Sequence, residues 1–158
     1  MQKRDLVRNE YEMRAAVIAS LLVLGSCAAP TAPRSHEAGL LDGTHWQLIQ
    51  LQSLEVGTLK PEDPTVYVMD LIAGGQLAMQ LDCNRAVGRW EAQPASATGG
   101  SISFGASAMT QAACLPGSMD TRIASDLERV RTYTLDGDRL KFALEGNGGV
   151  YTWRQIAQ

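Results

Sequence analysis

The stretch Gln76-Leu77-Ala78-Met79-Gln80-Leu81 decides the class of this fold. From Leu77 onward every second residue is large and apolar, which is the period of two that a half-buried β-strand requires. The pair Gly74-Gly75 supplies a turn just before it, and the run 65–72 before that turn is rich in β-branched and aromatic residues. The two runs therefore predict an antiparallel hairpin.

Short strand-like runs continue on both sides of this hairpin and predict a mostly β domain. The other expected strands are 44–51, 86–92, 102–104, 132–135, 139–145 and 150–156. Residues 93–100 are small and polar, so we expect a loop there. Asp136-Gly137 and the run 146–149 are turn signals that make the last three strands a meander.

One segment has helical periodicity instead. Met119, Ile123, Leu127 and Val130 recur at spacings of four, four and three residues, which places them on one stripe of a helix, and Gly117-Ser118 offers an N-cap. We therefore expect an α+β, β-rich fold: a strongly curved antiparallel sheet of about seven or eight strands, partly open and barrel-like, with one packed α-helix. The pattern leaves open whether this helix plugs the sheet or lies beside it.

The first 27 residues have the organisation of a secretory signal. Basic side chains are scattered ahead of an uncharged, mostly apolar run at 15–24, which ends in Leu24-Gly25-Ser26-Cys27. This run is too short to span a bilayer, which needs roughly 20 helical residues. Its ending resembles the lipobox of bacterial lipoproteins, and that likeness implies an acylated (palmitoylated) Cys27 as a membrane anchor. The alternative is an ordinary secretion signal that is cut near Ala28-Ala29.

On this interpretation the chain has three parts. Residues 1–26 are a lipoprotein signal peptide, residues 27–41 carry the lipidated Cys27 and a flexible tether, and residues 42–158 form the folded domain. Because aspartate directly after the cysteine often retains lipoproteins in the inner membrane, Ala28 favours the outer membrane. We therefore expect a lipoprotein of the outer membrane that faces the periplasm and is held there by its N-terminal lipid.

Composition bounds the size and the charge of the domain. Residues 27–158 keep ten of the 14 basic and 14 of the 17 acidic residues, so their net charge is −4. This acidic balance, with no basic run, excludes nucleic acid as a partner. A chain of this length forms one domain, which we expect to be monomeric.

Two cysteines, Cys83 and Cys114, remain in the domain once Cys27 is lipidated. An even pair in an oxidising compartment predicts a disulfide, which would stabilise the fold by roughly 3–4 kcal/mol. The alternative is a redox or metal pair, but neither cysteine has a second cysteine or a histidine at ligand spacing.

Three stretches resemble the META-domain family, also called HslJ-like heat-shock proteins. They are Gly43-Thr44-His45-Trp46-Gln47-Leu48, then Asp82-Cys83-Asn84-Arg85-Ala86-Val87-Gly88-Arg89-Trp90, and then Met109-Thr110-Gln111-Ala112-Ala113-Cys114. The resemblance covers about residues 42–156, with Asp82 in place of the family's usual glycine. It implies a curved antiparallel sheet with one helix, an envelope location, and links to heat shock and antibiotic tolerance. It implies no known reaction.

Candidate catalytic and metal-binding residues are sparse. His45 is the only histidine of the domain, and no Gly-x-Ser-x-Gly sequence occurs. Asp136 and Asp138 flank a turn glycine and are expected to be turn residues rather than a carboxylate pair. Glu62-Asp63 is too sparse for a metal site. The sequence therefore predicts a non-enzymatic protein with no catalytic residue, metal or cofactor.

Arg85 and Arg89 are the candidate contacts for a partner. They lie four residues apart in an expected strand and therefore share one face. Together they suit an anionic partner, such as a lipid headgroup or a lipopolysaccharide phosphate. The alternative is a strand face that only water covers.

Two functions remain open at this point. The first is an accessory or binding protein in envelope stress, whose sheet surface supports another envelope protein. The second is a carrier of a lipid or other small apolar ligand, in which the curved sheet opens a pocket lined by Met79, Phe142 and Trp153. The first predicts a filled core, which the moderate size of the apolar residues favours, and the second predicts a cavity.

Overall fold

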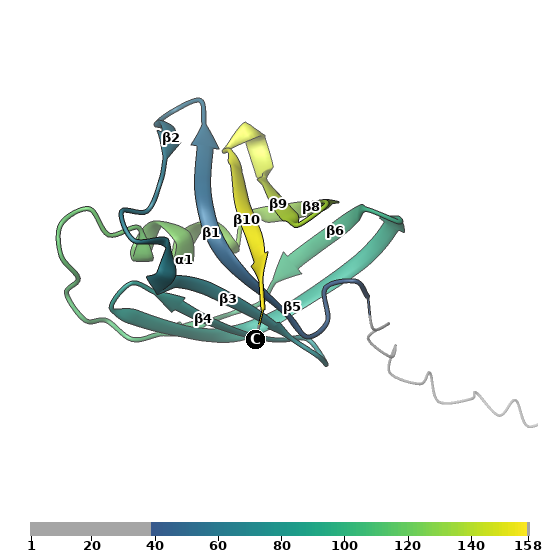
Figure 1. The fold of residues 1–158 in the computed structure, drawn as a ribbon, viewed down its shortest axis with the longest axis horizontal. Coiled ribbons are helices and arrows are strands. Elements are labelled where there is room, and N and C mark those ends of the chain that lie inside the picture. Colours follow the sequence, from purple (N-terminus) through teal and green to yellow (C-terminus); the bar gives the residue numbers. More distant parts are fainter. Residues whose placement is uncertain (1–38, 158) are drawn as a thin grey trace, which may run out of the picture. The chain divides into compact units, whose positions relative to one another are not determined.

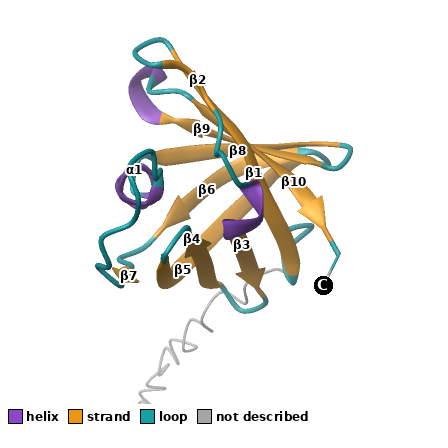
Figure 2. Ribbon diagram, turned by 60° about the vertical axis from the view of Figure 1, so that its left-hand side comes forward, coloured by secondary structure: helices purple, strands orange, loops and turns teal. Residues whose placement is uncertain are grey.

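The computed structural model describes residues 39–157, which form a β-barrel with one helix (Figure 1; Figure 2). The expected signal peptide, Cys27 and most of the expected tether lie outside the described residues. The strands are β1 (Thr44–Ser53), β2 (Gly57–Leu59), β3 (Tyr67–Ile72), β4 (Gln76–Leu81), β5 (Asn84–Ser96), β6 (Gly99–Phe104), β7 (Ala108–Met109), β8 (Val130–Asp136), β9 (Arg139–Leu144) and β10 (Val150–Ile156). The helix is α1 (Asp120–Leu127), and two 3₁₀ turns are η1 (Pro64–Val66) and η2 (Glu145–Asn147).

Eight of the strands close into a ring. They follow the order β1-β3-β4-β5-β6-β8-β9-β10, and β10 pairs back onto β1. The short strands β2 and β7 pair with β1 and β5 outside this ring. The β-rich, barrel-like fold with one helix is therefore confirmed, and the barrel is closed rather than partly open.

β5 is the strand that turns the sheet around the barrel. Its first half, Asn84 to Arg89, pairs with β4, and its second half, Trp90 to Ser96, pairs with β6. The expected loop at 93–100 is therefore wrong, because most of it belongs to β5 and β6 and only two residues separate the strands.

Glycines explain why this small, polar segment forms strands. β6 lies between β5 and β8, and a Cβ on Gly100 would sit 2.1 Å from the Gln93 carbonyl oxygen. A Cβ on Gly99 would sit 2.8 Å from the Tyr133 carbonyl oxygen. Only glycine permits this close approach of three backbones, which closes the barrel on that side.

One contiguous apolar core fills the ring. Leu77, Met79 and Leu81 are buried as their alternation predicts, and each tryptophan of the chain is at most 2 % exposed. Leu41, which the sequence assigned to the end of the tether, is 1 % exposed and belongs to this core. The packed chain therefore begins at or before Leu41.

The helix is shorter than its apolar stripe. α1 ends at Leu127, and Val130 is already the first residue of β8. Val130 is nevertheless buried in the same core. The apolar stripe therefore identifies four residues that share one core, and not four residues of one helix. The N-cap is Met119, not Ser118, although the Ser118 hydroxyl accepts a hydrogen bond from the Asp120 N–H over 3.3 Å.

Two inward-facing tyrosines place α1 across one end of the barrel. The Tyr67 hydroxyl of β3 accepts a hydrogen bond from the Met119 N–H over 3.0 Å, and the Tyr151 hydroxyl of β10 donates to Asp126 over 2.8 Å. β1 lies between these two strands in the ring.

In the described part of the chain, no helix has the length and apolar character needed to cross a bilayer.

The remaining differences concern short elements. β2 and β7, with three and two residues, were not expected, because alternation cannot be read over so few positions. β3 begins at Tyr67 rather than at 65, because Asp63 caps a 3₁₀ turn that starts at Pro64. Glu145, expected at the end of a strand, opens the second such turn.

Candidate functional site

Asn84, the first residue of β5, is the centre of the most connected polar cluster in the domain. Its carboxamide nitrogen donates to the Ala112 carbonyl over 3.0 Å and to the Asp120 carboxylate over 2.7 Å. Its carboxamide oxygen accepts from the Thr110 hydroxyl and from the Ala112 N–H, each over 2.8 Å. Asn84 is 1 % exposed, so these bonds replace the water that burial removed.

The structure joins Cys83 and Cys114 in a disulfide beside this cluster, with their Cα atoms 5.6 Å apart. The bond ties the β4–β5 turn to the segment that leads into α1. No group of three or more possible metal ligands occurs among residues 39–157. The disulfide and the hydrogen bonds of Asn84 together clamp the loop before the helix.

Asp120 completes the clamp from the first turn of α1. Burial would raise the pKa of this carboxyl, but hydrogen bonds from the Thr121 N–H, the Asn84 amide and the Ser118 hydroxyl together lower that pKa below its ordinary value. A carboxylate at a helix N-terminus is also favoured by the helix dipole. The group is a stable anion with its acceptors in use, which suits a structural role and not proton transfer.

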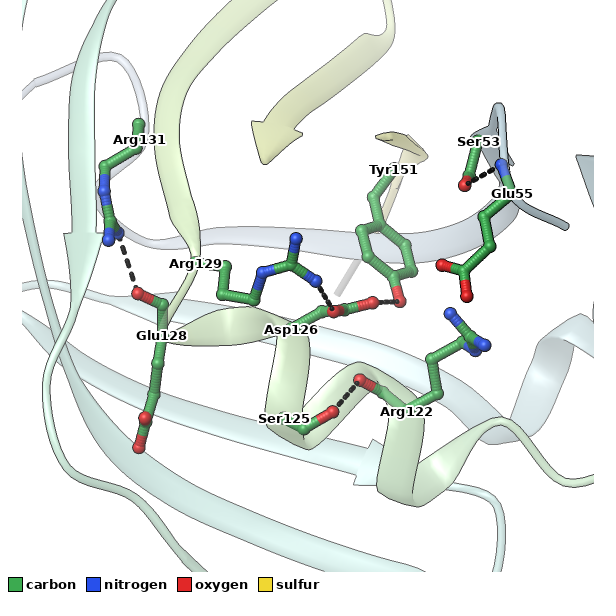
Figure 3. A network of polar contacts seen from close by, with 9 residues as sticks. All are labelled: Ser53, Glu55, Arg122, Ser125, Asp126, Glu128, Arg129, Arg131 and Tyr151. Atoms are coloured by element: carbon green, nitrogen blue, oxygen red, sulfur yellow. Dashed lines mark hydrogen bonds and ion pairs between the residues drawn. The ribbon is translucent and has the colours of Figure 1, made fainter. Parts of the chain in front are cut away.

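A second buried network holds the other end of the helix (Figure 3). Asp126 is 5 % exposed, and its two oxygens accept from the Tyr151 hydroxyl and, over 3.1 Å, from Arg129. Burial, and then the Asp126 carboxylate, raise the pKa of Tyr151 far above its ordinary value of 10.0. The hydroxyl and the guanidinium offset a carboxylate near the helix C-terminus, where the dipole disfavours it.

The other candidate acids and bases are not gathered in one place. His45 Nδ1 lies 2.6 Å from an oxygen of Asp70 on the neighbouring strand β3. Asp136 and Asp138 sit at the β8–β9 turn, as expected, and pair with Lys141 and Arg139. No described nucleophile is hydrogen-bonded to His45, so its pairing with Asp70 supplies no nucleophile–base pair.

Arg85 and Arg89 share the outer face of β5, on either side of Val87. Both are exposed, and neither guanidinium has a hydrogen-bond or ion-pair partner among the described residues. Val87 is 58 % exposed. The two arginines therefore share one face, as their spacing predicted.

The three residues expected to line a carrier pocket are packed instead. Met79, Phe142 and Trp153 are at most 4 % exposed and lie in the contiguous core. Phe142 also makes an edge-to-face contact with Phe104, with ring centroids 5.4 Å apart.

A groove of about 580 Å³ lies elsewhere, where the β1–β2 and β9–β10 hairpins extend side by side. Its lining is Gln52, Ser53, Leu54, Gly57, Thr58, Ala143, Leu144, Asn147, Gly149 and Val150. One register row, Thr58–Gln52–Val150–Ala143, crosses four strands. The lining has no charged side chain, and its polar groups are amides and hydroxyls.

This groove could not be predicted from the sequence. Its residues come from four strands and two turns, and each is ordinary for a strand end or a turn. The only signal is the exposed Leu54, which is 93 % exposed at the tip of the first hairpin. Without the β1–β10 pairing, nothing in the sequence brings the two hairpins together.

Comparisons with known proteins agree with this architecture. A model of the META domain family matches residues 39–155, which is most of the chain. A search of curated proteins finds no match.

Two solved structures are similar in fold. One is an NMR structure of a protein from Burkholderia xenovorans, with a TM-score of 0.61 and 19% identity over 75% of this chain and 86% of that one. The other is a crystal structure of a DUF4847 family protein from Bacteroides vulgatus, with a TM-score of 0.54 and 12% identity over 75% of this chain and 96% of that one. At these identities the likeness concerns the fold alone.

Proposed function

The chain belongs to the META domain family, and from this premise we propose that it is a non-enzymatic, lipid-anchored accessory protein of the cell envelope. Its barrel binds a partner protein through its outer surface. The partner is another envelope protein that this domain supports under stress, such as heat or antibiotic exposure.

The filled core is the observation that carries this proposal. A single buried cluster occupies the ring, and Leu144 is the one member of this cluster that also lines the groove. A barrel packed in this way offers surfaces rather than an interior. Recognition through an outer groove is therefore what this architecture supports best.

The chemistry of the groove suits an uncharged, extended polypeptide segment. Gln52, Thr58 and Asn147 offer hydrogen bonds, and Val150 and Ala143 offer a small apolar floor. β2, which forms one wall, pairs only with β1 among the described strands, so its other edge is open to a further strand.

The contacts of the buried carboxylates and of His45 suit a non-enzymatic role. The two buried carboxylates, Asp120 and Asp126, are committed to holding the helix. His45 has Asp70 beside it and no nucleophile.

Site-specific photo-crosslinking in cells tests the binding surface. With p-benzoylphenylalanine in place of Thr58, we expect an adduct of protein size after irradiation. Thr134 is the matched control, because it is also an exposed threonine on a strand, on β8 away from the groove. Equal adducts at both positions, or none at position 58, would contradict the proposed groove.

Fractionation tests the anchor. Cys27→Ser is expected to move the chain from the membrane fraction to the soluble fraction, because the acyl chains supply the attachment. Correctly processed Cys27→Ser chain that stays in the membrane pellet would contradict the lipoprotein assignment.

The carrier function has one observation in its favour. The indole nitrogen of Trp153 is buried without a hydrogen-bond partner among the described residues. An acceptor group on a bound lipid would satisfy it if the core residues around Trp153 moved apart to admit the lipid. Native mass spectrometry of the purified chain separates the two functions, since a carrier retains extra mass that denaturation releases.

A further inference from the structure

A second surface, separate from the groove, lies on the outer face of β3, β4 and β5 (Figure 1). We call it the β3–β5 patch, and it consists of Ile72, Ala78, Arg85, Val87 and Arg89. Strand register assembles it: Val87 pairs with Ala78, and Arg89 pairs with Gln76, which pairs in turn with Ile72. The patch therefore lies on one continuous face of three paired strands.

The patch combines free cations with exposed apolar groups. Val87 is 58 % and Ile72 is 40 % exposed, which places both among the few large apolar side chains that water reaches. The two guanidiniums beside Val87 have no anionic partner among residues 39–157.

The carboxylates around the patch do not neutralise these cations. Asp70 lies in the register row of Ala78 and Val87, but it is paired with His45. Glu91, the next outward residue on β5, lies beyond the end of β4 and pairs with Ser103 of β6. The face of the three paired strands thus carries two cations, Arg85 and Arg89, against the one carboxylate of Asp70, which makes no ion pair with either arginine.

We propose that the β3–β5 patch lies against the surface of a bilayer that contains anionic phospholipid. Guanidiniums bind phosphate oxygens through paired hydrogen bonds, and valine and isoleucine side chains favour the boundary between headgroups and acyl chains. Arg85 and Arg89 contact the headgroups, while Val87 and Ile72 enter the boundary between them.

The described chain enters the domain beside this face, and the proposed anchor lies a short way before that entry. The Gly43 N–H donates to the Leu71 carbonyl over 2.7 Å, so the chain enters the domain beside Ile72. Leu40, in the same turn, is 64 % exposed. Cys27 is 12 residues before Gly39, a separation that extended chain spans in at most about 40 Å. The inference therefore rests on the proposed lipid anchor, which keeps the domain within this distance of the bilayer.

Photo-crosslinking of the full chain in native membranes tests the patch. With p-benzoylphenylalanine in place of Val87, we expect an adduct with the added mass of one phospholipid, and none with the same residue in place of Thr134. Arg85→Gln combined with Arg89→Gln should lower the yield of this adduct severalfold, because two charges near an anionic surface are lost. Arg131→Gln combined with Arg139→Gln is the control, since it removes equal charge from an exposed position on β8 and a half-buried one on β9.

The outcomes separate this inference from the proposed function. A protein-sized adduct at position 87, or no lipid adduct from a chain that fractionates with membranes, overturns the patch and leaves the anchor intact. A lipid adduct that the Arg85→Gln and Arg89→Gln changes do not reduce overturns the role of the arginines. A chain found in the soluble fraction overturns the anchor and the patch together, whereas the result at Thr58 bears only on the groove.

Discussion

The Asn84 carboxamide donates to the Asp120 carboxylate over 2.7 Å and so joins the first residue of β5 to the first residue of α1. Thirty-six positions separate the two residues in the chain. The bond shows why the Cys-Asn pair and the Thr-x-x-x-Cys segment belong together: they meet in one clamp that sets where the helix starts.

Asn84→Ala should lower the free energy of unfolding by about 3 kcal/mol. The change leaves the buried Asp120 carboxylate and the part-buried backbone groups of Ala112 without their partner, and an unpaired buried group costs about 1–3 kcal/mol. Urea unfolding followed by tryptophan fluorescence measures this. Ser103→Ala, on the exposed side of β6, is the control and should be neutral. An Asn84→Ala chain as stable as the control would show that the clamp is dispensable.

Removing either cysteine or both should destabilise the domain by the same amount, because each change breaks the same disulfide. Cys83→Ala and Cys114→Ala should each lower the melting temperature and reduce the free energy of unfolding by about 3–4 kcal/mol. Each change removes the same bond and so frees the same loop of the unfolded chain. The double variant should melt with the single ones. Thermal unfolding with and without reductant measures both effects, and additive losses in the double variant would mean that the cysteines act separately.

Tyr151→Phe should change how stability depends on pH. The folded pKa of this hydroxyl is raised, so the unfolded chain loses its proton first and the native protein loses stability as pH rises above about 10. The variant has no such group. At neutral pH it should be about 1–2 kcal/mol less stable, because Asp126 loses one donor, and this gap should narrow in alkali. Urea unfolding curves at a series of alkaline pH values measure the difference in free energy of unfolding between the two chains. A difference that stayed constant with pH would contradict this account.

Gly100→Ala should prevent normal closure of the barrel. The added methyl group would meet backbone atoms of β5 at 2.1 Å, where no side-chain rotation relieves the contact. We expect a loss of at least about 2 kcal/mol or a chain that does not fold. Gly105→Ala is the matched control, because its nearest neighbour would be 3.8 Å away. Circular dichroism and urea unfolding of the pair decide the matter, and equal stabilities would show that β6 can move away from β5.

The hairpin and the apolar face of the sheet could be predicted because their signals are local. Leu77, Met79 and Leu81 alternate within one strand, and the pattern survives packing. Residues 93–100 could not be assigned, because the role of Gly99 and Gly100 depends on β8, a strand some thirty residues further along the chain. Val130 fits the helical stripe by its spacing, but the helix ends before it. The Arg129 N–H donates to the Asp126 carbonyl, three residues back, so the chain changes direction there instead of continuing the helix.

The candidate site divides in the same way. Arg85 and Arg89 could be placed on one face from their spacing alone, since alternation within a strand fixes it. The groove could not be predicted, because it exists only where the first and last hairpins of the domain meet. The buried hydrogen bond between Asp126 and Tyr151 could not be predicted either, because the sequence around a charged helix residue does not indicate which distant residue will pair with it.

The pairing of β1 with β10 also governs the order of events in folding. β1 can pair with β2 and β3 early, but it meets β10 only when residues 150–156 exist, so a nascent chain that lacks them leaves the ring open. Contacts of such long sequence separation delay the transition state, because the chain must close a loop of about a hundred residues before they form. Until residues 150–156 have been synthesised, the edge of β1 that pairs with β10 therefore stays exposed.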